Sequence, residues 1–310
     1  MSMRNQAAVR RATMAALVGN SIFGFSFMSS RIALAIALPS VLLMVRFIAA
    51  AALLLAVAAW SSRAARMGRH CPAWLRFSLR GRRLAPLLLL GFVQPVLYFL
   101  CESYGISMTN ATISGVLIAL IPIASLALGA LLLGERPRRA QVLWSMLSIA
   151  GVVMMTMQQS AEGEIRPLGV ALLIGAVLTG AAYNIISRGI SGEYSVLERT
   201  VVMMVMAAVV FTGMAIWQTR GDITLLLAPL AEPAFLLALA YLSVCSSVGA
   251  FMLLNYANTE LPVAKTTAFC NLTTVISLFA GAVFLGEPFG AVSVIASAMI
   301  IAGIWGVQKN

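Results

Sequence analysis

The sequence is poor in charge, and it is poorest in the residue types on which most hydrolytic enzymes depend. Only 10% of its 310 residues are charged, whereas soluble domains carry roughly 25%. It holds one aspartate, Asp222, and one histidine, His70. A two-aspartate membrane protease is therefore excluded, and neither H-E-x-x-H nor G-x-S-x-G occurs. Hydrolysis and metal chemistry are poorly supported, so we expect neither an enzyme activity nor a cofactor.

Other absences narrow the class further. No G-x-x-x-x-G-K-[ST] stretch is present, so ATP-driven pumping by this chain alone is not expected. The four cysteines are scattered without C-x-x-C spacing, and we expect them to be small buried residues. The sequence contains no repeated selectivity-filter motif of the kind that would indicate a channel. The net charge of +11 does not indicate a nucleic-acid partner, because the arginines lie at expected helix ends and in short loops.

What the sequence does have is a series of long uncharged apolar runs. It is 61% hydrophobic, and a helix needs roughly 20 apolar residues to cross a bilayer. The runs predict an all-α, polytopic membrane protein with ten transmembrane helices. The expected spans are about 12–31, 40–60, 84–104, 110–133, 140–157, 168–187, 197–217, 234–256, 263–285 and 289–307.

The chain also repeats itself. Sliding residues 129–157 by 152 positions onto residues 281–309 brings many identical residues together. The matches include Gly134–Glu135 with Gly286–Glu287 and Ile149–Ala150–Gly151 with Ile301–Ala302–Gly303. Such internal repetition indicates that the chain contains two copies of one structural unit. We therefore divide the chain into a first five-helix repeat, residues 1–160, and a second, residues 161–310.

Basic residues orient the spans. With the N-terminus inside, fifteen Lys and Arg residues lie in cytoplasmic segments and three in external loops. Both termini are therefore expected in the cytoplasm. Because each repeat has an odd number of spans, the second repeat enters the membrane from the opposite side. Inverted repeats of this kind are typical of transporters that work by alternating access.

The longest loop, residues 61–83, holds seven arginines together with Trp74, Leu75, Phe77 and Leu79. Arginines interspersed with apolar residues suit a segment that lies on the anionic inner leaflet. We expect this loop to bind anionic lipids and to anchor the chain, although a regulatory role is an alternative.

The residues around the repeat resemble a known family. Pro122, the stretch LLLGERP at 131–137 and Gly151 have counterparts in FLGEP at 284–288 and Gly303. In these features the chain is similar to the ten-helix EamA type of the drug/metabolite transporter superfamily. The resemblance implies a bacterial inner-membrane exporter in which four helices of each half surround a central cavity. General similarity within the superfamily suggests neutral or aromatic amino acids as cargo. Thr274 stands where the first copy has Pro122, so a bend there need not recur.

Polar residues within spans are the candidates for the substrate site, because they are costly in lipid and face a bundle interior or a cavity. The candidates for cavity lining are Asn20, Phe23, Gln94, Tyr98, Tyr183, Asn184, Ser246 and Asn271. Aromatic rings beside amides would suit a small-molecule substrate with an apolar body and a polar head. The alternative is packing and hydrogen bonding between helices, which such residues supply in many membrane bundles.

Charged residues near the spans are candidates for gating or coupling. Arg46 and Arg199 match at a shift of 153. We expect Arg46 and Glu102 to interact when the outside is closed, and Arg199 or Lys265 to play the same part inside. The alternative is that these side chains simply reach the interface. Glu102 is also the one carboxylate expected at membrane depth. A proton antiporter would use such a group, whereas a facilitator or exchanger would not need it.

The Gly-Glu pairs precede the fifth and tenth spans. We expect the carboxylates of Glu135 and Glu287 to accept bonds from the free N–H groups at the start of the next helix. This is a structural role rather than a substrate-binding one.

Overall fold

The computed structural model describes residues 3–79, 81–109, 117–157, 166–285 and 290–310, and within these ranges every regular element is helical. The helices are α1 (Met3–Leu34), α2 (Pro39–Arg66), η1 (Ala73–Leu75), α3 (Ala85–Gly91), η2 (Phe92–Leu97), α4 (Tyr98–Ser107), α6 (Ile121–Leu132), α7 (Arg139–Thr156), α8 (Pro167–Gly189), α9 (Val196–Thr219), α10 (Ile223–Leu227), η3 (Ala228–Ala231), α11 (Pro233–Ala240), η4 (Tyr241–Ala250), α12 (Phe251–Glu260), α13 (Val263–Thr267), η5 (Ala268–Asn271), α14 (Leu272–Leu285) and α15 (Ala291–Lys309). The all-α prediction is confirmed.

Within the described residues, nine helical stretches are long and apolar enough to cross a membrane, and α6 is a shorter apolar helix. The expected span 110–133 thus corresponds to α6 over its second half, while residues 110–116 lie outside the described residues. The helix α1 begins at Met3, well before the expected residue 12, because the basic N-terminal segment continues the helix. The helix α2 continues six residues beyond its expected end, to Arg66, and the remaining expected spans agree with the structure to within four residues.

Local sequence explains where several helices begin. Pro39, Pro167 and Pro233 each occupy the first turn of a helix, where the missing N–H costs no hydrogen bond. The helix α9 begins with a capping box. The Ser195 hydroxyl accepts from the Glu198 N–H at 3.1 Å, and the Glu198 carboxylate accepts from the Ser195 N–H at 2.9 Å.

The third and eighth expected spans are interrupted by wide π-helical turns, η2 and η4. In η2, Gln94 leaves the helical conformation, with φ −146° and ψ 127°, because a residue before proline is pushed towards extended backbone. The 152-residue shift that relates the two copies pairs Gln94 with Ser246 in η4. The two interruptions therefore lie at equivalent positions of the two halves.

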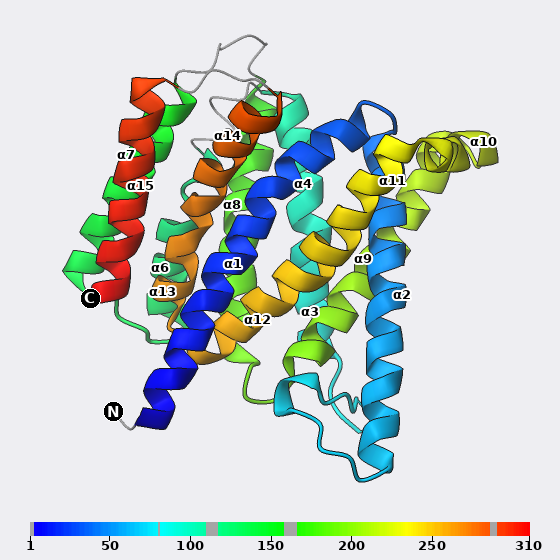
Figure 1. The fold of residues 1–310 in the computed structure, drawn as a ribbon, viewed down its shortest axis with the longest axis horizontal. Coiled ribbons are helices and arrows are strands. Elements are labelled where there is room, and N and C mark those ends of the chain that lie inside the picture. The colour runs from blue at the N-terminus through cyan, green and yellow to red at the C-terminus, as the bar shows by residue number, and fades with distance from the viewer. Residues whose placement is uncertain (1–2, 80, 110–116, 158–165, 286–289) are drawn as a thin grey trace.

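Contacts between the halves follow a reciprocal pattern. The helices α7 and α15 pack together at one side of the bundle, and α2 and α9 pack together at the other (Figure 1). In addition, α8 packs against α4 and α6, and its counterpart α1 packs against α12 and α14. Each of these helix–helix contacts thus has an equivalent contact in which the first and second halves are interchanged.

Glycines permit the closest of these contacts. A Cβ built on Gly151 of α7 would lie 2.7 Å from the Ala296 carbonyl oxygen, and one on Gly303 of α15 would lie 2.6 Å from the Trp144 carbonyl oxygen. These two glycines are equivalent in the repeat. Small residues let helix backbones approach closely within a membrane, where hydrophobic burial does not drive association. On the other side, Phe47 of α2 stacks on Phe211 of α9 with ring centroids 5.5 Å apart.

Candidate functional site

Among the described side chains, two arginines are buried inside the bundle. Arg46 of α2 is 5% exposed and Arg199 of α9 is 0% exposed. They match at a shift of 153, one residue more than the shift of the Gly-Glu motifs. Arg46 lies in the first third of α2 and Arg199 near the start of α9, and these two helices begin towards opposite ends of the bundle (Figure 1). An ionisable residue at membrane depth is costly and marks a functional site by default.

Arg199 is fully surrounded by acceptors. Its Nη1 donates to the carbonyl and the hydroxyl of Ser187, each at 2.8 Å. Its Nη2 donates to the Asn255 carbonyl at 2.9 Å and to the Thr259 hydroxyl, and its Nε donates to the Ser195 carbonyl at 3.4 Å. Five bonds use the full donor capacity of a guanidinium. Arg199 therefore ties α9 to α8 and α12.

Asn255 is the centre of the same set, which we call the Arg199 cluster (Tyr183, Ser187, Arg199, Asn255 and Thr259). Its Oδ1 accepts from the Ser187 hydroxyl at 2.8 Å and from the Tyr183 hydroxyl at 3.2 Å. Its Nδ2 donates to the Thr200 hydroxyl at 3.0 Å. Tyr183 is 2% exposed and Asn255 is 0% exposed. In this conformation the Tyr183 side chain is packed between helices and does not line an open cavity.

Asn184 extends this network. Its Nδ2 donates to the Gly180 carbonyl at 3.0 Å, and its Oδ1 accepts from Asn258 Nδ2 at 3.4 Å. The other amide atom of Asn258, Oδ1, is buried and has no partner among the described residues. Sequence reasoning gave Asn258 no role, and its only signal is that it follows Asn255 by three residues on one helical face.

A salt bridge closes the same end of the bundle. Arg188 at the end of α8 donates from Nε to Glu135 Oε1 at 3.1 Å and from Nη1 to the Asn258 carbonyl at 3.3 Å. The other oxygen of Glu135 accepts from the N–H of Val263, the first residue of α13, at 2.8 Å. Glu135 thus caps a helix as predicted, but the helix is α13 and not the next one, α7. The start of α7 is served by Gln141, whose Oε1 accepts from the Arg138 N–H at 3.0 Å. Glu287 lies outside the described residues.

Arg46 has a different environment. Its Nε donates to the Ser247 hydroxyl at 2.7 Å and its Nη2 to the Ser246 hydroxyl at 2.9 Å. Ser246 in turn donates to Ser26 at 3.3 Å, which links α2 to η4 and α1. The guanidinium carbon lies 5.3 Å from the centroid of the Phe47 ring and 5.4 Å from that of Phe99, within cation–π range. We call Arg46, Ser26, Ser246, Ser247, Phe47 and Phe99 the Arg46 cluster.

Glu102 is not bonded to Arg46 in this conformation. Its Oε1 accepts from the Tyr98 hydroxyl at 2.8 Å, one helical turn away on α4. Both side chains are half-buried. The expected Arg46–Glu102 gate pair is therefore not formed in this structure, although Glu102 follows Phe99 by three residues and so faces the same way.

Three further predicted residues lie around this central region. Phe23 of α1 packs edge-on against Phe251, with ring centroids 5.2 Å apart. Gln94 is half-buried, and its Oε1 has no partner among the described residues. Asn20 is 2% exposed and donates to the Ala16 carbonyl of its own helix at 2.8 Å. The amide of Asn20 is therefore turned to the backbone in this conformation.

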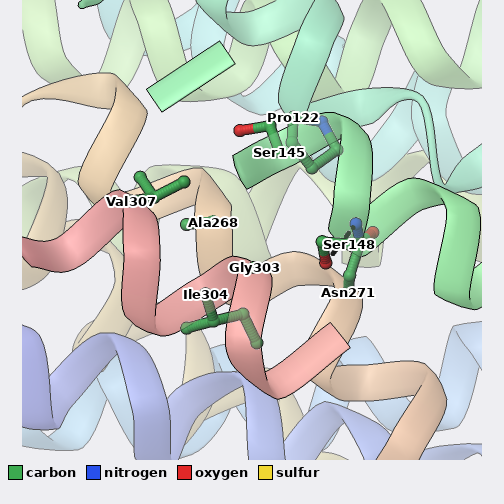
Figure 2. A pocket seen from close by; sticks show the side chains of 8 residues that line it. All are labelled: Pro122, Ser145, Ser148, Ala268, Asn271, Gly303, Ile304 and Val307. Atoms are coloured by element: carbon green, nitrogen blue, oxygen red, sulfur yellow. Dashed lines mark hydrogen bonds between the residues drawn. The ribbon is translucent and has the colours of Figure 1, made fainter. Parts of the chain in front are cut away.

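Asn271 and Lys265 lie apart from both arginine clusters. Asn271 donates to the Ser148 hydroxyl at 3.1 Å, across a gap between α7, α15 and η5 that is too narrow to hold a water molecule (Figure 2). Lys265 donates to the Gln308 carbonyl at 2.7 Å, and Gln308 Nε2 donates back to the Lys265 carbonyl at 2.6 Å. In this conformation Asn271 joins η5 to α7, and Lys265 joins α13 to α15.

The segment 61–83 folds onto the protein as well as facing outwards. The Ser78 N–H donates to Glu198 Oε1 at 2.8 Å, and the Ser195 hydroxyl donates to the Arg76 carbonyl at 2.6 Å. Leu75 and Phe77 are half-buried and pack against the core cluster that includes residues of α2 and α9. Trp74 remains 43% exposed.

The two ends of the bundle differ in how they are closed. Both arginine clusters are buried apart from one half-buried member each, Thr259 and Phe99. All of the described side chains from Leu97 to Ser103 and from Leu272 to Leu278, in α4 and α14 together with the residue before α4, are half-buried. We call the end at the start of α9, which carries the Arg188–Glu135 salt bridge, the sealed end, and the end with these half-buried stretches the accessible end.

Comparison with known proteins adds the family. The model of the EamA-like transporter family matches residues 10–157 and again residues 167–308. The uncharacterised transporter YcxC of Bacillus subtilis (strain 168) is 29% identical over 303 residues, which make up 96% of this chain and 93% of that protein. A probable terminal-alkyne amino-acid exporter of Streptantibioticus cattleyicolor is 27% identical over 232 residues, 74% of this chain and 75% of that protein.

A solved crystal structure shares the fold, with a TM-score of 0.74 and 17% sequence identity over 96% of each chain. The family model covers both halves, each with its own match. The resemblance seen in the Gly-Glu motifs is therefore confirmed across nearly the whole chain. The chain belongs to the EamA-like transporter family, and it is a multi-pass membrane transporter rather than an enzyme.

Proposed function

We propose that this chain exports small amphipathic metabolites, with neutral or aromatic amino acids as the first class, by alternating access. The observation that carries the proposal is the unlike state of two matching arginines. Arg199 holds α8, α9 and α12 together with five hydrogen bonds, while Arg46 makes two, both to hydroxyls. A transporter closed at one end and accessible at the other would have this asymmetry.

The proposal includes two inverted repeats, residues 1–160 and 161–310. The reciprocal contacts support it: α4 with α8 is matched by α12 with α1, and α6 with α8 by α14 with α1. The equivalent interruptions at Gln94 and Ser246 support it as well. We place the protein in the bacterial plasma membrane with both termini in the cytoplasm, on the basic-residue count and on its bacterial relatives. The sealed end is then the cytoplasmic one.

The substrate class rests on the central residues and on one relative. Phe99 contacts both the Arg46 guanidinium and the Tyr98 ring, and Tyr98 bonds Glu102, so that apolar rings stand beside charged groups. Phe23 packs against Phe251. The Streptantibioticus protein is named as a probable amino-acid exporter. An amino acid with an apolar side chain combines the same two characters.

Two mechanisms for Glu102 follow. In the first, Glu102 pairs with Arg46 when the accessible end closes, and so acts as a gate. In the second, it takes up and releases protons, and couples export to a proton gradient. Glu102 is half-buried and accepts one bond, from Tyr98, so it is free to exchange partners. A facilitator or exchanger would use only the first mechanism.

Counterflow in proteoliposomes tests the function. The full-length protein is reconstituted with unlabelled phenylalanine inside, and entry of labelled phenylalanine is followed. A carrier accumulates label transiently above the level of equilibration, whereas a channel does not. Repeating the measurement over a range of pH with Glu102→Gln tests coupling. An unchanged rate and pH dependence would remove the proton-coupling role but leave the carrier.

A further inference from the structure

Arg46 is a buried cation that forms no direct salt bridge among the described residues. It is 5% exposed, and its two hydrogen bonds go to the neutral hydroxyls of Ser246 and Ser247. Among the described residues no acceptor meets its Nη1, and no carboxylate stands within ion-pairing distance. A buried charge that is neither paired nor fully hydrogen-bonded is expensive, so a chain that keeps one has a use for it.

The matching arginine shows what a purely structural role looks like. Arg199 donates to three carbonyl oxygens and two hydroxyls, and no donor is left over. The hydroxyls of Ser246 and Ser247 instead hold one side of the Arg46 guanidinium and leave Nη1 free. A guanidinium held in this way is suited to bind a carboxylate, because its planar fork can donate two parallel hydrogen bonds to the two carboxylate oxygens.

Glu102 of α4 likewise forms no direct salt bridge among the described residues. Glu102 takes a bond from Tyr98 on Oε1, and its Oε2 has no partner among the described residues. Phe99, one turn before Glu102, touches the Arg46 guanidinium with its ring. The two opposite charges are therefore carried on neighbouring helices, α2 and α4, and each keeps an unused binding position at the accessible end of the bundle.

We propose that Arg46 binds the carboxylate and Glu102 the ammonium group of a zwitterionic α-amino acid, whose apolar side chain lies against the neighbouring rings. This inference rests on the proposed export function and assigns its recognition residues. Ser246 and Ser247 are positioning residues, since they act by holding the guanidinium. The site would discriminate against amines, which leave Arg46 unpaired, and against carboxylic acids, which leave Glu102 unpaired.

Three probes of one shape separate the two charges. Phenylalanine carries both groups, 3-phenylpropionate carries only the carboxylate, and phenethylamine carries only the ammonium group. Binding to the purified full-length protein is measured by ligand-induced thermal shift and by displacement of labelled phenylalanine. The wild-type protein is expected to bind phenylalanine most tightly. Arg46→Gln should weaken the binding of phenylalanine and of phenylpropionate by about tenfold or more and leave the binding of phenethylamine unchanged. Glu102→Gln should weaken the binding of phenylalanine and of phenethylamine and leave the binding of phenylpropionate unchanged.

Matched variants guard the result. Arg63→Gln removes an exposed arginine from the far end of the same helix and should leave all three affinities unchanged. Arg46→Lys keeps the charge but loses the fork, so it should bind phenylpropionate with intermediate affinity. This variant preserves the test if Arg46→Gln does not fold.

Specific results would overturn the assignment. One is that Arg46→Gln and Arg46→Lys bind phenylpropionate as the wild type does. Another is that each substitution weakens the acid and the amine equally. If the wild type binds none of the three probes yet shows counterflow of another solute, the zwitterion site is wrong and the transport function stands. If no solute shows counterflow, the proposed function itself fails.

Discussion

The sharpest structural prediction concerns Gly303, where α15 meets α7. A Cβ at this position would lie 2.6 Å from the Trp144 carbonyl oxygen, 2.7 Å from Ser148 Cβ and 2.9 Å from the Ser148 nitrogen. Two of these atoms belong to the backbone and cannot turn aside. Gly303→Ala must therefore push the two helices apart.

The size of the effect follows from the distances. Ordinary van der Waals contact begins at 3.4 Å, so α7 and α15 would separate by about 0.8 Å. Overpacking of this kind costs about 1–3 kcal/mol. At roughly 2–4 °C for each kcal/mol in a large domain, the melting temperature should fall by about 2–12 °C. Intrinsic fluorescence during thermal unfolding in detergent measures it, and Trp144 reports on the altered contact directly.

Gly213 provides the matched control. It lies in α9, and nothing stands within 4 Å of a Cβ built on it. Gly213→Ala gains up to about 1 kcal/mol of helix propensity and should not lower the melting temperature. If Gly303→Ala melts with the wild type, or if both variants fall equally, the argument from close helix approach is refuted.

Three further predictions concern the polar contacts. Arg199→Lys should lower the unfolding free energy by about 2–4 kcal/mol, because an ammonium group cannot reach five acceptors. Its melting temperature should therefore fall far more than that of Arg63→Lys, which changes an exposed residue, and equal melting of the two variants would contradict this. Glu135→Gln should weaken the contact with Arg188 and raise the reactivity of cysteines placed at the sealed end, measured with a membrane-impermeant maleimide; unchanged labelling would argue against a latch. Ser195→Ala should remove the α9 cap and cost about 1 kcal/mol, seen in the same thermal assay.

Much of the fold follows from the sequence alone. Runs of uncharged residues predict the spans, since no other structure satisfies the backbone in lipid. The wide turn in η4 is different, because nothing in the local sequence around Ser246 sets it apart from a regular helix. In η2, Pro95 is a local signal for an interruption near Gln94, but we predicted one continuous span there without using it. The length of α1 was underestimated because charge marks the edge of the membrane and not the end of a helix.

The candidate site was predictable only in part. Burial of Arg46 and Arg199 follows from their place within apolar runs, but their partners do not, because helix register across the bundle is not encoded locally. Glu135 illustrates the limit. Its carboxylate caps a helix as expected, yet the helix begins 128 residues later in the chain. Asn271 was predicted to line the cavity and Lys265 to act at the inner gate, and their partners in this structure, Ser148 and Gln308, could not be predicted because the sequence does not show how each helix is rotated.

The wide turns η2 and η4 affect how this protein changes shape. The turn η2 divides its span into two parts, since α3 packs mainly against α9 and α4 packs against α8, while η2 itself contacts both. A tilt of α4 can then occur about the turn while α3 stays in place. Spin labels on either side of residues 92–97 would record unequal displacements during one turnover, although hydropathy draws that stretch as a single rod.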